Sequence, residues 1–207
     1  MIRVPTGTPP PQGHGEDPLT HYTRVYVRFL QLVFQTFEPG SYRWSLDPNA
    51  SEVEITDQSK LARETVERRP AIIVSRGTVS MGNLSLDQFR GIEGTDGKRL
   101  HTDLVSMQLS ANCLSKEGYE AQRLAHIVSM ATRRLKRSLM RAGIHRVGEE
   151  IVISGETPPG AFVPGSDNEI VMISVSVPIW FQDWWSVEPV DKTLLSNLQL
   201  ALTSGVN

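Results

Sequence analysis

The sequence predicts an α+β fold in which a mixed, mostly antiparallel sheet packs two long helices on one face. Residues 103–113 alternate apolar and polar side chains, which is typical of a half-buried strand. Residues 20–37 and 115–143 instead repeat apolar side chains at helical spacing. The expected order is helix, short strands, strand, long loop, long strand, long helix and two further strands, which gives this class.

The length of 207 residues fits one domain with appendages. Residues 1–18 are rich in proline and glycine and cannot bury enough apolar surface to offset the entropy of ordering. We expect them to form a flexible, disordered arm, or an arm that orders on a partner. Residues 19–189 are expected to form a single α+β domain, connected by long loops, and residues 190–207 a C-terminal tail or short helix.

The overall charge argues against general adhesion to nucleic acid or acidic membranes, because 21 basic and 23 acidic side chains give a net charge of −2. The single cysteine, Cys113, cannot form an internal disulfide and alternates with apolar residues, so we expect a buried thiol in a reducing compartment. The first residues lack the apolar stretch of a signal peptide. No apolar run approaches the roughly 18–20 residues that span a bilayer, so no membrane partner is expected.

The first helix is expected over Thr20–Phe37, and Pro39 and Gly40 end it. Leu32 and Phe34 lie outside its apolar stripe. Because the helix is apolar on more than one side, a second face packs in the core or against another subunit. The stripe comprises Tyr22, Val25, Tyr26, Phe29, Leu30, Val33 and Phe37.

The middle of the chain is mixed in character. Residues 42–44 and 52–55 favour short strands, and the charged segment 57–69 a short helix or a mobile loop. Residues 70–75 form a buried strand that begins with proline. Five glycines interrupt residues 76–98, which we interpret as a long loop that contacts a partner or is disordered.

The clearest strand covers residues 100–114. Its polar face could line a wet channel, form a polar interface or be an ordinary solvated sheet face, because its side chains are small and uncharged. The apolar face comprises Val105, Met107, Leu109, Ala111 and Cys113, and the polar face Ser106, Gln108, Ser110 and Asn112.

The second helix follows this strand directly, with Ser115 as the expected N-cap and Gly143 as the expected C-cap. Cations crowd its last two turns, where they complement the helix dipole and could also contact phosphates. These cations are Arg133, Arg134, Lys136, Arg137 and Arg141. The buried side is expected to comprise Tyr119, Leu124, Ile127, Val128, Ala131, Leu135 and Leu139.

Two more strands are expected at 150–153 and 169–177, the later one closed by Pro178, with a loop or hairpin tip at 156–168 between them. An aromatic cluster follows. Its side chains could stack on bases, but such residues more often build a core edge or a protein interface. The cluster comprises Trp180, Phe181, Trp184 and Trp185.

No catalytic, cofactor-binding or metal-binding motif is recognisable. The five histidines lack the spacing that places two ligands on one helix face, and no glycine-rich phosphate loop occurs. We therefore expect no catalytic, cofactor or metal residues, no cofactor, and a binding or assembly protein rather than an enzyme.

Three stretches carry a resemblance to a known family. They are Arg69–Gly77, the polar strand ending Ser110-Ala111-Asn112-Cys113, and the helix start Ser115-x-x-Gly118-x-x-Ala121-x-x-Leu124-Ala125. Over about residues 20–187, the chain resembles the tail terminator and neck (head-tail joining) proteins of long-tailed bacteriophages.

The resemblance implies a structural virion protein that forms a ring, with six subunits expected, on the tail tube. Such a ring stops tube polymerisation and joins the tube to the head–neck connector. Its partners would be other copies of itself, the tail tube protein, possibly the sheath, the neck or connector protein, and DNA passing through the lumen without sequence specificity. It would be assembled in the host cytoplasm and reside in the virion at the neck–tail junction.

Two alternatives remain open: another neck or head-completion component, and a non-viral α+β module that binds nucleic acid. The basic helix end and the aromatic cluster supply the candidate interface or lumen residues, which are Arg133, Arg134, Lys136, Arg137, Arg141, Trp180, Phe181, Trp184 and Trp185.

Overall fold

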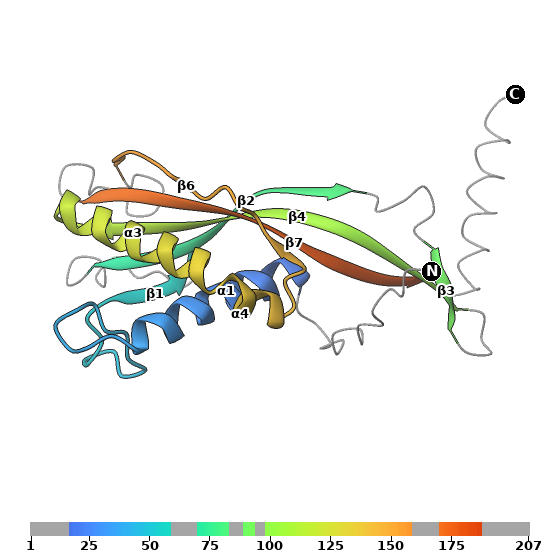
Figure 1. Cartoon of the computed structure of the whole chain (residues 1–207), viewed down its shortest axis with the longest axis horizontal. Coiled ribbons are helices and arrows are strands. Elements are labelled where there is room, and N and C mark those ends of the chain that lie inside the picture. The colour runs from blue at the N-terminus through green and yellow to red at the C-terminus, as the bar shows by residue number, and fades with distance from the viewer. Residues whose placement is uncertain (1–16, 59–69, 83–88, 94–97, 159–169, 188–207) are drawn as a thin grey trace, which may run out of the picture. The chain divides into compact units, whose positions relative to one another are not determined.

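The computed structural model describes residues 17–58, 70–82, 89–93, 98–158 and 170–187 (Figure 1). The predictions for the N-terminal arm, the segment 57–69, the hairpin tip and the C-terminal tail fall wholly or largely outside these residues. The helices are α1 (Pro18–Gln35), α3 (Gly118–Arg134) and α4 (Lys136–Arg141). The strands are β1 (Glu54–Asp57), β2 (Ala71–Gly82), β3 (Phe89–Glu93), β4 (Lys98–Ser115), β5 (Arg146–Val147), β6 (Val152–Ile153) and β7 (Val171–Val187).

These strands form one mixed, mostly antiparallel sheet, which confirms the predicted α+β class. The strand order is β1-β2-β4-β7-β5, with β3 paired to β4 and β6 paired to β7. β1 and β2 are parallel, whereas β5 and β6 each run antiparallel to β7. The described part of the chain contains no helix long and apolar enough to cross a membrane.

The chain divides into two compact units. The larger comprises residues 10–80 and 106–181 and contains the three helices. The smaller comprises residues 1–9, 81–105 and 182–207, and within it β3 pairs with the first part of β4. The predicted basic helix end therefore lies in the larger unit, while Trp184 and Trp185 lie in the smaller.

Helix α1 begins two residues earlier than expected, because Pro18 occupies its first turn and the Asp17 carboxylate accepts a hydrogen bond from the Leu19 amide at 3.3 Å. Phe34, which the helical stripe excluded, is fully buried. The reason is tertiary: the chain after the helix folds back, and the Trp44 amide donates to the Phe34 carbonyl at 3.1 Å. Leu32 is half exposed, as its place outside the stripe predicts.

The segment between α1 and β1 contains no strand at residues 42–44, contrary to the prediction. Tyr42 adopts a φ of 67°, which is incompatible with an extended strand. The strand expected at 52–55 forms slightly later, as β1.

The long loop expected at 76–98 is largely strand, which is the main correction to the predicted fold. β2 continues from the buried segment 71–75 to Gly82, and β3 follows at Phe89. Gly77 lies within β2, where an added Cβ would stand 3.3 Å from the Gln108 Cβ on β4. This glycine therefore permits close approach of two strands rather than a turn.

Both long helices pack on one face of the sheet. Tyr22 of α1 packs its ring 4.2 Å from that of Phe181 on β7, and Tyr26 shares a hydrogen bond of 2.9 Å with Thr132 of α3. The predicted apolar face of β4 is buried beneath them, Cys113 included, and burial raises the pKa of its thiol. The predictions of helices on one face and of a buried thiol are confirmed.

The opposite face of β4 is polar as predicted, but at its end it is buried rather than solvated. Asn112 is 3% exposed and donates to the Ile73 carbonyl at 3.2 Å and to Ser75 Oγ at 2.9 Å. Its Oδ1 accepts a hydrogen bond of 2.6 Å from Ser174 Oγ. One buried amide thus links β2, β4 and β7. Gln108, which precedes Asn112 on the same face of β4, is exposed.

The second helix is shorter than expected at both ends. Ser115 precedes it rather than capping it: its Oγ accepts from the Glu117 amide at 3.1 Å and donates to the Glu120 carboxylate. The helix breaks at Leu135, which lies between the end of α3 at Arg134 and the start of α4 at Lys136. Gly143, at a φ of 103°, follows α4 as predicted. Tyr119 and Leu135 are exposed, not buried as the periodicity predicted, because they lie at the first turn and at the break.

Strand β7 passes through Pro178, which was expected to end it. The Pro178 carbonyl accepts a hydrogen bond of 2.7 Å from the Gly148 amide. Since the amide and carbonyl of one residue point to the same side of an antiparallel strand, the donor that proline lacks would face Gly148 and not β4. The ladder between β4 and β7 therefore tolerates the proline.

The hydrogen bond between Tyr26 and Thr132 yields a stability prediction. Thr132 Oγ1 donates to the Val128 carbonyl at 2.8 Å, so its single proton is used and the Tyr26 hydroxyl must be the donor. We expect Tyr26→Phe to lower the free energy of unfolding by about 1 kcal/mol, and Thr132→Val, which leaves a buried donor unsatisfied, by about 1–3 kcal/mol. Urea denaturation measures both. A neutral Thr132→Val, or a double variant with fully additive losses, would contradict this assignment.

Candidate functional site

The outer surface of the helices is strongly cationic, although the chain as a whole is slightly acidic. The three helices carry eight arginine and lysine residues and one carboxylate, that of Glu120. The cations are Arg24, Arg28, Arg123, Arg133, Arg134, Lys136, Arg137 and Arg141. All eight are exposed. We call this set the cationic helical surface.

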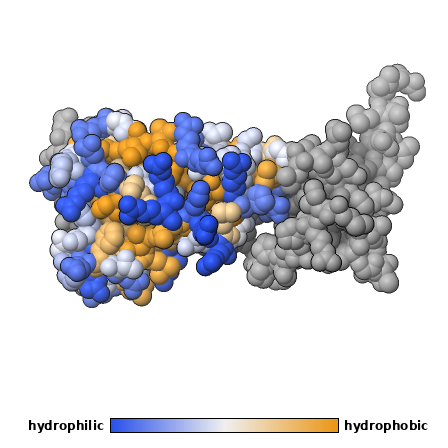
Figure 2. Space-filling view, viewed as in Figure 1, coloured by the Kyte–Doolittle hydropathy of each residue, from blue (hydrophilic) through white to orange (hydrophobic). Residues whose placement is uncertain are grey.

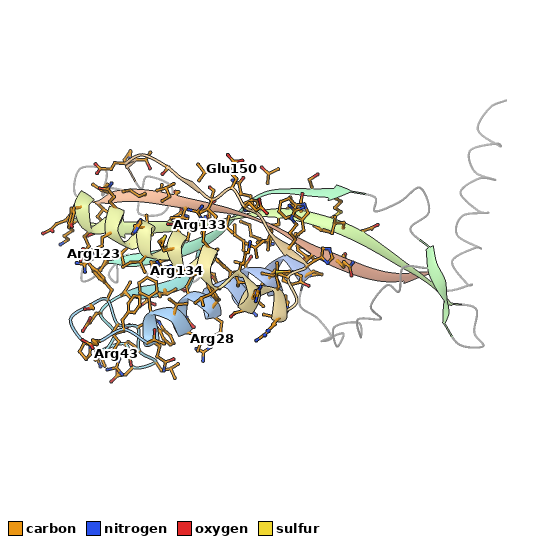
Figure 3. The ribbon with its side chains drawn as sticks, viewed as in Figure 1. Arg28, Arg43, Arg123, Arg133, Arg134 and Glu150 are labelled. Carbon is orange, nitrogen blue, oxygen red and sulfur yellow. The ribbon has the colours of Figure 1, made fainter. Side chains whose placement is uncertain are left out.

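Amphipathicity explains where these cations lie. α1 and α3 bury their apolar sides against the sheet, so their charged side chains point away from it. Figure 3 shows Arg133 and Arg134 near the end of α3, Arg123 nearer its start and Arg28 on α1. Exposed apolar side chains lie among these cations, notably Leu32, Leu135 and Met140. In Figure 2, hydrophilic and hydrophobic residues accordingly alternate over the helical part of the molecule.

The basic helix end has the composition that the sequence predicted. Among the described residues, its five cations have no ion-pair partner. Arg133 and Arg134 lie in the last turn of α3 and Arg141 in the last turn of α4, where the helix dipoles favour positive charge, whereas Lys136 and Arg137 lie in the first turn of α4. Their charge is therefore available to a polyanion or an acidic protein surface.

Other guanidinium groups rest on aromatic rings. Arg28 lies 5.8 Å from the ring centroid of Trp44, and Arg123 lies 5.4 Å from that of Tyr42. Such contacts favour a cation above the ring face and restrict the long side chain. Parts of the cationic helical surface are thus fixed in position before any partner binds.

The predicted aromatic cluster is not one surface patch. Trp180 is half-buried with the Arg146 guanidinium 5.5 Å from its ring centroid, whereas Phe181 is 1% exposed and packs on Tyr22. Alternation along β7 places neighbouring residues on opposite faces of the sheet, which corrects the expectation that Phe181 is available to a partner. The side chains of Trp184 and Trp185 lie outside the described part of the structure.

The segment that connects α1 to β1 is held by one carboxylate. Glu52 accepts hydrogen bonds from the Gly40 amide at 2.6 Å and the Arg43 amide at 3.1 Å. These amides lower the pKa of Glu52. Gly40 and Arg43 lie on either side of Tyr42, and their hydrogen bonds to Glu52 support its positive φ. The pKa of Tyr42 is raised, first by desolvation and then by the charge of Glu120.

Two cavities border α1. One of about 340 Å³ lies between Arg28, Trp44 and Ile55, and one of about 450 Å³ lies between Thr23, Arg24 and Val74. Within the described ranges, no three His, Cys, Asp or Glu residues are placed to hold a metal ion. The cationic helical surface offers positive charge, hydrogen-bond donors and exposed apolar groups.

Sequence reasoning found the five cations at the helix end but missed Arg24, Arg28 and Arg123. The signal was present, since all three occupy polar positions of amphipathic helices. The sequence does not show that α1 packs beside α3. This packing joins the cations of the two helices into one surface. No protein-family model matches the chain, and no curated protein shows significant sequence similarity to it.

The hydrogen bonds of Glu52 give a pH prediction. Because the folded-state pKa of Glu52 lies below its usual value of 4.5, its carboxylate stabilises the fold above that pH. This contribution disappears as the pH falls through the folded-state pKa. Glu52→Gln should therefore lower the free energy of unfolding at about pH 7, and this effect should be smaller at about pH 3.

Urea denaturation at both pH values checks this expectation. Glu38→Gln, an exposed glutamate of the same segment, is the matched control. Equal effects of the two substitutions at neutral pH would show that the contacts of Glu52 contribute nothing specific.

Proposed function

We propose that this chain is a structural virion protein of a long-tailed bacteriophage, a tail terminator that forms a ring on the tail tube and joins it to the head–neck connector. The motifs of the resemblance support this proposal, and the α+β fold is compatible with it. In this role the protein binds other copies of itself, the tube protein, the sheath where the tail has one, and the neck or connector protein. DNA passes through the ring, which resides at the neck–tail junction after assembly in the host cytoplasm.

The observation that carries the proposal is the cationic helical surface with its interleaved apolar residues. An assembly protein at a DNA passage needs non-specific attraction for phosphate and contact area for protein partners. Cations supply the first without reading bases. Exposed Leu32, Leu135 and Met140 supply the second, because apolar side chains and arginine are common where proteins meet.

The alternatives differ in what they require of this surface. A neighbouring neck or head-completion component uses the same features in another ring of the same junction. A non-viral nucleic-acid-binding module needs only the cations, and the charge segregation on a chain of net −2 is the observation that favours it. That module would bind DNA tightly as a monomer and would not recognise tail tubes.

The first experiment measures the mass of the purified protein by light scattering, alone and with tail tubes, followed by negative-stain imaging. We expect closed rings, six-fold in symmetry, that cap one end of each tube. A protein that stays monomeric in the presence of tubes and neither caps nor binds them would overturn the proposal. Capping of the connector instead of the tube would assign the chain to the neighbouring neck component.

A charge-neutralised variant tests the role of the helix end. Arg133→Gln, Arg134→Gln and Arg137→Gln together should weaken binding to duplex DNA of any sequence, and the slope of log Kd against log salt concentration should fall by about 0.9 for each phosphate that the variant no longer neutralises. Fluorescence anisotropy at several salt concentrations measures this slope. Lys116→Gln, an exposed cation ahead of α3, is the matched control. An unchanged slope in the triple variant would place the DNA-binding surface elsewhere.

A further inference from the structure

The sheet of the larger unit has two open edges at opposite ends of its strand order. β1 covers β2 only from Ala71 to Val74, so residues 75–80 have β4 on one side and no strand on the other within the part of the chain described. At the far edge, β6 pairs with β7 and with no other strand among the described residues. Each edge presents main-chain donors and acceptors on which an added strand can pair.

A cavity lies where β1 ends, between α1 and the open part of β2. It measures about 450 Å³, and the side chains around it include Thr23, Val74, Arg24, Arg76 and Asp57. Its lining combines one apolar side chain, that of Val74, with hydroxyl groups, one carboxylate and two arginines, of which Arg76 forms an ion pair of 3.2 Å with Asp17. The cavity has the size to admit a side chain from an incoming strand.

The β6 edge carries an exposed apolar side chain, that of Ile153, on the face of the sheet where this cavity lies. Ile153 is 44% exposed and pairs with Val175 of β7. Val175 is buried on the same sheet face as Phe181, which contacts α1, so Ile153 also lies on the helical face. Glu149 and Glu150, both exposed, precede β6, and Figure 3 shows Glu150 on the side of the sheet away from Arg28 and Arg43.

The strand directions are compatible with pairing of the two edges. Contacts of Ser75 with Ser110 and of Ser80 with Ser106 show that β2 and β4 are antiparallel. β4 and β7 also run in opposite directions (Figure 1), and β6 is antiparallel to β7. Continuing the sheet from one copy into the next therefore sets β6 antiparallel to β2, the arrangement that ordinary hairpins use.

We propose that the β6 edge of one copy pairs with residues 75–80 of β2 in the next copy, with Ile153 entering the cavity beside α1. The two edges differ, so the contact is heterologous and repeats from copy to copy until a ring closes. The existence of the ring rests on the proposed function. The inference names the two sheet edges that meet between neighbouring copies.

Cysteine cross-linking tests the contact directly. Thr78 is exposed on the open edge, and the native Cys113 is buried, so introduced thiols have no exposed competitor among the described residues. A mixture of Thr78→Cys and Ile153→Cys proteins under mild oxidation should yield disulfide-linked dimers, whereas each protein alone should yield none. The double variant should give a ladder of covalent species that ends at the ring size. Dimers of a single variant would indicate a two-fold contact and overturn the proposal.

A second variant separates this contact from the existence of rings. Ile153→Lys should convert rings to monomers with an unchanged circular dichroism spectrum, because a long charged side chain replaces the apolar one at the centre of the contact. Val152→Lys, on the opposite sheet face and similarly exposed, should leave the ring intact. Rings that survive Ile153→Lys and give no cross-link would overturn the edge contact alone, with the terminator proposal standing. A wild-type chain that forms no ring on tubes would overturn both.

Discussion

The two faces of strand β4 pack against different surroundings, one apolar and one hydrogen-bonded. The rest of the larger unit depends on this arrangement. Its odd-numbered side chains from Met107 to Cys113 are buried beneath the helices, whereas Asn112 on the other face holds β2 and β7 through Ser75 and Ser174. Strict alternation is what allows both, since a shift of one residue would exchange the two faces. The buried amide also fixes the register, because an unsatisfied amide in the interior would cost free energy in every other pairing.

The helical layer depends on that register in turn. Tyr22 and Tyr26 are on the same side of α1, and they contact Phe181 of β7 and Thr132 of α3 respectively. One helix is thereby fixed against both the sheet and the other helix. The outward sides of the helices then carry the charge, so the cationic helical surface is a direct consequence of how the apolar sides are buried.

The charge distribution and the open sheet edges are independent features that suit the same kind of protein. A cationic face attracts polyanions or acidic partners at long range, and unpaired edges provide specific, directional contact between copies. The proposed role in a ring uses both features.

The sequence by itself determined the α+β class, the strand over β4, the buried Cys113 and the basic helix end. These are local properties: side-chain periodicity and composition decide them before any tertiary contact forms. It did not determine that β2 continues through Gly77, that β7 continues through Pro178, or that Phe34 and Phe181 are buried. Glycine and proline end strands only when their neighbours do not compensate. Here the Gln108 side chain fills the space beside Gly77, and the carbonyl of Pro178 pairs with Gly148.

The cationic helical surface and the two open edges were likewise decided by tertiary structure, because each joins residues far apart in the chain. Long-range packing, not local preference, sets which side chains share a surface.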